Sequence, residues 1–240
     1  MLLYGKNSVH ERLKANPKSI QKIIAQDTFR DTDIERLIAR HRIPVEHVSL
    51  KALARIKPAE NLQGIVAYID TFIYTAFEDA LSKPHSKPLS PVFLNKIYDP
   101  QNLGAIIRTA ACLGGFSVVI PRHRACEVTE TVLHVAQGGE NYVPVSMVTN
   151  ISTAIRDAKE RGYWIAGALV TDDAQDIGGI SLPFPLGIVL GSEGEGLGHG
   201  VQRSLDIKMR IPMKGAGLSF NVAIACAILC YEISRKRMAQ

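Results

Sequence analysis

The sequence lacks any apolar run long enough to cross a membrane. Its longest apolar runs, residues 116–120 and 224–230, are far shorter than the roughly 20 residues that a membrane-spanning helix requires. The first residues also lack the basic region, long apolar core and small-residue cleavage site of a secretory signal. We therefore expect no transmembrane helix and no membrane partner, and we expect the protein to stay in the cytoplasm.

Cysteine is scarce, with 4 residues in 240, and the sequence contains no Cys-x-x-Cys pair and no nearby histidine cluster at zinc spacing. This absence argues against a structural zinc site, so no metal is expected. Cys226 and Cys230 are four residues apart in an apolar run, which predicts two buried, reduced thiols on one helical face.

Charge of one sign is only mildly in excess, with a formal net charge of +5. Residues 1–75 hold 12 Lys and Arg against 8 Asp and Glu, so most of the excess lies there. Two readings remain open, because these cations could bind phosphates or could form an ordinary solvated face. The basic residues concerned are Lys14, Lys18, Lys22, Lys51, Arg55 and Lys57.

The patterning predicts two α/β units joined by a linker. Residues 77–90 are rich in Pro, Ser and Lys, a composition that resists regular structure and favours extended conformations. Residues 1–76 before it alternate helical and strand patterns within one compact unit. Residues 91–240 alternate strands with helices, which predicts a mostly parallel sheet covered on both faces.

Periodicity and capping residues place the individual elements. In the first unit we expect helices around Val9 and Leu13 (capped by Asn7 or Ser8), after Asp31 and Thr32, and from Ser49, with strands at 20–24, 43–48 and 64–69. In the second we expect strands at 92–97, 116–120, 163–169, 186–190 and 206–211, and helices at 105–113, 128–135, 152–161 and 221–235.

Three polar segments containing glycine lie at strand ends of the second unit, where open α/β sheets bind ligands. They read DPQNLGAIIRTA (99–110), LGSEGEGL (190–197) and IPMKGAGLSFNVAIA (211–225). The second segment lacks the Gly-x-Gly-x-x-Gly spacing of a dinucleotide site, and the third lacks the Gly-Lys-Ser/Thr ending of a P-loop. The carboxylates of Glu193 and Glu195 would repel a pyrophosphate, so a cationic or neutral ligand is favoured.

Each polar residue in these segments also has an ordinary structural explanation. Arg108 has apolar neighbours in a predicted helix, so its charge either reaches solvent or faces an anion. Asn102, six residues earlier on the loop that starts this helix, favours the anion reading. Ser219 and Asn221 precede the last predicted helix, where such residues commonly act as N-caps.

Taken together and in order, the three segments resemble the motifs of the SpoU (TrmH) family of RNA ribose 2'-O-methyltransferases in the SPOUT superfamily. The resemblance covers residues 92–236, and the first unit, from YGKNSVHERL to NLQGIVAYI, is similar to the family's L30e/L7Ae-like RNA-binding domain. It implies an α/β fold with a parallel sheet and a C-terminal trefoil knot, one of the rare exceptions to unknotted chains. It also implies a homodimer, because family members complete each RNA site with residues from a partner subunit.

The resemblance further implies a site that binds S-adenosylmethionine and transfers its methyl group to a ribose 2'-hydroxyl. The matched cofactor positions are Ala168, Leu169, Gly191, Ile211, Met213, Leu218 and Phe220. The matched catalytic positions are Asn102, Arg108, Glu193, Ser219 and Asn221. Arg108 corresponds to an arginine often described as the group that helps remove the hydroxyl proton. Because a guanidinium is effectively always protonated, we expect Arg108 to stabilise the developing alkoxide, with Glu193 as its counter-charge.

The sequence departs from the usual family motifs at two places, and three functions remain possible. Phe220 stands where Leu is usual, which alters the shape of the adenine slot, and AQGGE at 136–140 replaces the usual Ser-x-Gly-Ala. The arrangement is most similar to enzymes that methylate guanosine in 23S rRNA. The alternatives are a tRNA ribose methyltransferase and a non-catalytic RNA-binding ribosome assembly factor, and the matched catalytic positions argue against the latter.

Overall fold

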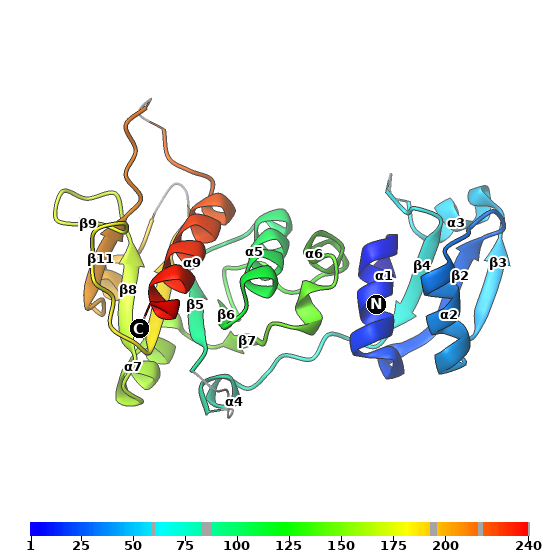
Figure 1. Cartoon of the computed structure of the whole chain (residues 1–240), viewed down its shortest axis with the longest axis horizontal. Helices are drawn as coiled ribbons and strands as arrows, with labels where there is room; N and C mark the ends of the chain where they lie inside the picture. The colour runs from blue at the N-terminus through cyan, green and yellow to red at the C-terminus, as the bar shows by residue number, and fades with distance from the viewer. Residues whose placement is uncertain (59–60, 83–87, 193–195, 216–217, 240) are drawn as a thin grey trace.

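The computed structural model describes residues 1–58, 61–82, 88–192, 196–215 and 218–239, and it contains two separate β-sheets (Figure 1). The first sheet has four strands in the order β1-β4-β2-β3. Its unit consists of β1 (Leu2–Tyr4), α1 (Lys6–Ala15), η1 (Pro17–Ser19), β2 (Ile20–Gln26), α2 (Thr32–His41), β3 (Val45–Val48), α3 (Leu50–Ile56) and β4 (Ile65–Ile69).

Local capping explains where two helices of this unit begin. Asp31 accepts a hydrogen bond from the Ile34 amide at α2, and Ser49 accepts one from the Ala52 amide at α3, so both predicted starts are confirmed. The predicted cap of α1 is wrong, because this helix begins at Lys6 after Gly5, whose φ is 90°. Ser8 is buried within the helix, and the Lys6 amide at its start donates a hydrogen bond to the Gln63 side chain at 2.7 Å.

The second sheet has seven strands in the order β7-β6-β5-β10-β8-β11-β9, and each pairing described within it is parallel. This confirms the predicted parallel sheet, and β5, β6 and β10 are buried along their whole length. The strands of the unit are β5 (Ser90–Leu94), β6 (Phe116–Pro121), β7 (Val145–Val148), β8 (Trp164–Ala168), β9 (Gln175–Asp176), β10 (Leu186–Leu190) and β11 (Ile207–Arg210). The helices are α4 (Phe77–Ser82), α5 (Pro100–Leu113), α6 (Glu130–Ala136), η2 (Gly139–Asn141), α7 (Ile151–Glu160), α8 (His199–Gln202) and α9 (Val222–Met238).

The expectation of irregular structure throughout residues 77–90 is wrong at the start of that segment. Phe77 and Ala80 are buried, and the ring of Phe77 packs edge-to-face on Phe93 at 5.9 Å between centroids. This apolar anchor supports helix α4, whereas residues 70–76 connect the two units without helix or strand (Figure 1). Residues 83–87 lie outside the described part of the chain, and the division into domains stays a prediction.

The C-terminal helix crosses back over the sheet. Strand β11 lies three places from β5 in the sheet, yet α9, which follows β11, packs against α5, which follows β5. Cys226 and Cys230 are buried on α9, as predicted, with their sulfurs 3.7 Å apart. The trefoil knot implied by the resemblance stays a prediction. No helix in the described ranges has both the length and the apolar character needed to cross a membrane.

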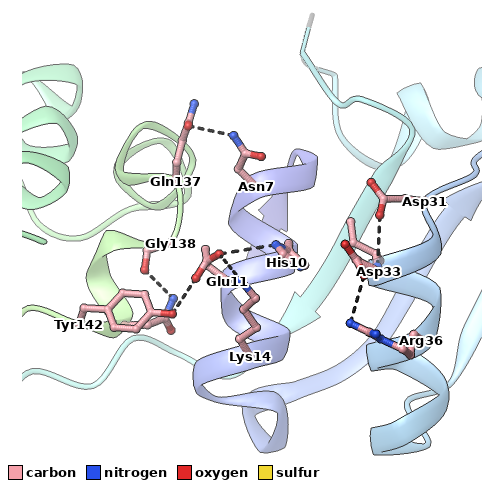
Figure 2. Close-up of polar contacts among 12 residues, drawn as sticks. Asn7, His10, Glu11, Lys14, Asp31, Asp33, Arg36, Gln137, Gly138 and Tyr142 are labelled. Carbon is pink, nitrogen blue, oxygen red and sulfur yellow. Dashed lines mark hydrogen bonds and ion pairs between the residues drawn. The ribbon is translucent and has the colours of Figure 1, made fainter. Parts of the chain in front are cut away.

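The two units meet through α1 and β1 on one side and α6 and η2 on the other (Figure 2). Asn7 donates a hydrogen bond to Gln137 at 3.2 Å, and the Tyr142 hydroxyl donates one to Glu11 at 2.6 Å. At Gly138, φ is 90° and an added Cβ would lie 2.3 Å from the Cβ of Glu11. Gly138 is therefore required by the close approach of α1, which gives the unusual AQGGE segment a structural role.

A buried ion pair lies at the centre of this interface. The Arg12 guanidinium is 3.0 Å from Glu140, and the two side chains are 9% and 0% exposed. Burial raises the pKa of Glu140 above its ordinary value, although Arg12 acts to lower it. Since a buried carboxylate without a counter-charge is strongly unfavourable, α1 and η2 depend on each other electrostatically.

We expect Arg12→Met to lower the free energy of unfolding by about 3 kcal/mol at neutral pH, because it leaves the Glu140 carboxylate buried and unpaired. The double variant Arg12→Met, Glu140→Gln should recover most of this loss in urea unfolding. The loss should also shrink at acidic pH. A carboxyl whose folded pKa is raised stabilises the fold below its unfolded pKa and loses that contribution as pH rises through the raised value. Equal destabilisation at both pH values would contradict this account.

Candidate active site

A cavity of about 750 Å³ opens at the carboxyl ends of strands β10, β8 and β11, beside the start of α9. These three strands are neighbours in the sheet and parallel, so their following loops emerge at one edge. The strand order reverses between β5 and β10, because β6 and β7 lie on one side of β5 and the later strands lie on the other. Ligands of open α/β sheets bind at such a switch point.

The cavity brings together all seven residues that the sequence motifs matched to a cofactor site. Its lining includes Ala168, Leu169, Gly191, Ile211, Met213, Leu218 and Phe220, together with Ser219 from the catalytic set. Motif reasoning missed further lining residues, namely Val170, Thr171, Leu190, Ser192, Gly196, Leu197, Gln202, Arg210, Gly215, Val222 and Ala225. Most of them are neighbours of motif residues in the sequence. Their position directly after a predicted strand is the signal that could have identified them as lining residues. The roles of all these residues stay proposals.

Gly191 is fixed by a very close approach of two chain segments. A Cβ at Gly191 would lie 2.3 Å from the carbonyl carbon and oxygen of Gly196. The Gly196 amide donates a hydrogen bond to the Ser192 carbonyl at 2.9 Å, which holds these two residues close together. Any side chain at Gly191 would displace Gly196, which lines the cavity together with Ser192. Glu193, expected as a counter-charge, lies outside the described residues.

Asn221 performs two tasks at the edge of the cavity. Its Oδ1 accepts a hydrogen bond from the Ala223 amide at 2.9 Å, which caps α9 and confirms the predicted cap. Its Nδ2 donates a hydrogen bond to Oδ1 of Asn102, also at 2.9 Å. Ser219 lines the cavity instead of capping the helix. One side chain thus joins the start of α9 to the start of α5.

Helix α5 begins earlier than the sequence pattern predicted. Asp99 accepts a hydrogen bond from the Gln101 amide at 2.8 Å, and Pro100 occupies the first helical position. Asn102 therefore lies in the first turn of α5 rather than in a preceding loop. This rigid position orients its amide toward Asn221.

Arg108 stands apart from the other matched residues. It lies on α5 six residues after Asn102, about 9 Å further along the axis and roughly 240° around it. Its side chain is exposed, and no hydrogen bond or ion pair joins it to another residue in the described ranges. The two residues therefore project from different faces of α5, and the structure does not bring Arg108 into its own chain's cavity.

Charge inside the cavity is largely neutralised. Arg210 is paired with Asp176 at 2.6 Å, and this hydrogen-bonded carboxylate raises the pKa of Arg210 above its ordinary value. Most other lining residues are apolar or glycine. Among the described residues, no cluster of three His, Cys, Asp or Glu side chains could hold a metal ion. The cavity can therefore accept a ligand with an apolar surface and polar groups directed at backbone atoms.

Comparison with protein-family models gives two matches that together span most of the chain. A model described as the SpoU rRNA Methylase family matches residues 90–231. A second model, described as RNA 2'-O ribose methyltransferase substrate binding, matches residues 2–75.

Similar whole proteins and solved structures accompany these matches. The Bacillus subtilis protein YacO, a putative TrmH family tRNA/rRNA methyltransferase, is 34% identical over 239 residues, which cover 97% of this chain and 94% of YacO. The Streptomyces viridochromogenes SpoU methyltransferase AviRb, in complex with AdoMet, matches with TM-score 0.83 at 19% identity over 100% of this chain and 91% of that one. The AdoMet-bound rRNA methyltransferase of Sinorhizobium meliloti matches with TM-score 0.80 at 24% identity over 99% and 87%. At these identities the structural matches show a shared fold.

Proposed function

Because the chain belongs to the SpoU rRNA methylase family and is an RNA methyltransferase, we propose that it methylates the ribose 2'-hydroxyl of a guanosine in 23S rRNA. We propose S-adenosylmethionine as the methyl donor, since two of its structural neighbours are described as bound to AdoMet. The observation that carries this proposal is the single cavity that all seven matched cofactor residues line.

The residues of the cavity fit this donor. A volume of about 750 Å³ is within the range of small-molecule sites, and the walls are mainly apolar. Ile211, Leu218 and Phe220 supply apolar surface for an adenine ring, while the strand ends at Ala168 and Gly191 supply backbone groups for its polar atoms. When bound, S-adenosylmethionine supplies an electrophilic methyl group on a sulfonium centre.

The protein's own contribution is to position and polarise the ribose hydroxyl. The Asn102–Asn221 hydrogen bond fixes two amide groups, and Asn221 lies between Phe220 and Val222, which line the cavity; we propose that the two amides orient a ribose there. The role of the cationic Arg108 side chain is to stabilise the negative charge that develops on the attacking oxygen. Ser219 lines the cavity, and in this proposal it contacts the same ribose.

We further propose that the protein works as a homodimer in which Arg108 completes the cavity of the partner copy. Arg108 is exposed and lies on a different face of α5 from Asn102, so a second chain can receive it. Helix α9, which begins at the cavity, carries Ile224 and Tyr231 with 53% and 61% of their surface exposed. These residues are seven apart and share one helical face, which forms an apolar stripe suited to burial.

We expect the double variant Ile224→Asp, Tyr231→Asp to be monomeric and inactive, because it places two charges where the dimer buries apolar surface. Light scattering at constant protein concentration measures the mass. The matched control is Leu50→Asp, which changes an equally exposed apolar residue at the start of α3 in the other unit. A variant that remains dimeric, or a wild-type protein that is monomeric, would remove α9 from the interface.

Mapping ribose methylations in total RNA with and without the gene tests the substrate. Loss of one 2'-O-methylguanosine from 23S rRNA is the expected result. Loss of a ribose methylation from tRNA would favour the tRNA enzyme, an alternative supported by the similarity to YacO, a putative TrmH family tRNA/rRNA methyltransferase. An unchanged methylation map would favour the non-catalytic assembly factor.

A further inference from the structure

A short basic segment lies at the same sheet edge as the cavity and belongs to none of the three motifs. Arg122, His123 and Arg124 follow the end of β6, and all three side chains are exposed. Strand β6 is separated from β10 by β5 alone, and all three are parallel. Two strand spacings place the end of β6 roughly 10 Å from the end of β10 and its Gly191 turn.

The backbone of this segment is held at both ends. The Arg122 amide donates a hydrogen bond to the Val148 carbonyl at 2.8 Å, which extends the pairing of β6 with β7. The Cys126 amide donates one to the Ile97 carbonyl, also at 2.8 Å, in the loop that leads into α5. Between these anchors Arg124 adopts a left-handed conformation with φ of 58°. The segment is thus a fixed turn attached to the loop that precedes Asn102.

The charges on this turn are not used within the chain. Neither Arg122 nor Arg124 forms an ion pair or side-chain hydrogen bond with another residue in the described ranges. Asp99, in the loop to which the segment is attached, is engaged as the cap of α5. By contrast, Lys14, Lys22 and Lys57 of the first unit are all paired with carboxylates.

The segment also lies between the cavity and the unit that matches the substrate-binding model. It leads into α6, which packs between α5 and α1 (Figure 1). The Val128 amide donates a hydrogen bond to the Tyr74 hydroxyl at 2.9 Å, and Glu130 accepts one from the Leu2 amide at 2.7 Å. An RNA that contacts both the first unit and the cavity can therefore pass along this turn.

We propose that Arg122 and Arg124 bind backbone phosphates of the RNA next to the nucleotide held at the cavity. This inference rests on the proposed function for the identity of the polymer, and it extends that function to residues outside the family motifs. Exposed, unpaired guanidinium groups on a fixed turn bind phosphate oxygens through charge-assisted hydrogen bonds without reading sequence. His123, exposed between them, is available to the same strand.

The test compares two double variants that remove equal charge. Arg122→Gln, Arg124→Gln removes the proposed contacts. Arg156→Gln, Arg161→Gln removes two exposed arginines from the middle and the C-terminal end of α7. Affinity for a 23S rRNA transcript, and for a mixture of tRNAs as the second probe, is measured by fluorescence anisotropy over a series of salt concentrations.

We expect the first variant to bind RNA about tenfold more weakly at moderate salt, with the slope of log affinity against log salt reduced by about 1.4 for two lost phosphate contacts. Its melting temperature and its Kd for S-adenosylmethionine should equal those of the wild type. The same loss in both variants would show a non-specific charge effect and overturn the proposal, as would undiminished binding in the first. Because binding is measured apart from methylation, an inactive wild-type enzyme would refute the proposed function without deciding the role of this turn.

Discussion

Arg108→Ala should reduce methyl transfer by about 10²–10³-fold while leaving the affinity for S-adenosylmethionine nearly unchanged. The guanidinium lies outside the cavity of its own chain, so its removal takes away charge stabilisation without changing the walls that hold the donor. Single-turnover kinetics with saturating donor measures the first quantity, and calorimetric titration the second. The control is Arg156→Ala, which removes an exposed arginine from the middle of α7.

A mixing experiment decides whether Arg108 acts within its own chain or on the partner. Arg108→Ala retains an intact cavity, and Gly191→Ala retains the arginine. If the arginine serves the partner's cavity, co-refolding these two impaired proteins and assaying them at limiting S-adenosylmethionine should restore about a quarter of wild-type activity, because half of the random dimers then contain one complete site of two. If it acts within its own chain, the mixture stays inactive. Full activity of Arg108→Ala alone would remove this residue from the mechanism.

Gly191→Ala should weaken binding of S-adenosylmethionine by about 100-fold. This is the loss expected when an added methyl group overpacks a site and displacing its neighbours costs about 3 kcal/mol. The added methyl group would lie 2.3 Å from backbone atoms of Gly196, and backbone cannot move aside as a flexible side chain can. Gly196, which lines the cavity, would therefore be displaced. Calorimetric titration measures the affinity, and thermal melting shows whether the rest of the fold is intact.

Gly198→Ala is the matched control for this substitution. Gly198 lies a few residues further along the same loop, its φ is −61°, and an added Cβ would meet nothing within 4 Å. Its affinity for the donor should be that of the wild type. A Gly191→Ala protein that binds as tightly as this control would show that the turn at Gly196 does not shape the donor site.

Local signals in the sequence predicted most of the elements because they act between residues that are close in the chain. The side chains of Asp31, Ser49 and Asn221 each cap a helix within three residues of themselves. The buried strands β5, β6 and β10 were visible as short apolar runs separated by helical patterns. The elements that were missed or misplaced depend on distant partners: α4 exists because Phe77 packs on Phe93, and α1 starts at Lys6, whose amide donates a hydrogen bond to the Gln63 side chain.

The sequence by itself determined the class of chemistry, since the ordered motifs and their spacing identified the family and seven residues that line one cavity. Only the tertiary structure decided which of the polar side chains lie next to one another. It joined Asn102 to Asn221 across 119 residues and turned Arg108 away from them on α5. It also placed Arg122 and Arg124, which form no ion pair in the described ranges, at the sheet edge where the cavity opens. The physical reason is that the order of strands in the sheet, rather than their order in the chain, sets which loops are neighbours. That order depends on packing between distant segments, which short-range patterns do not encode.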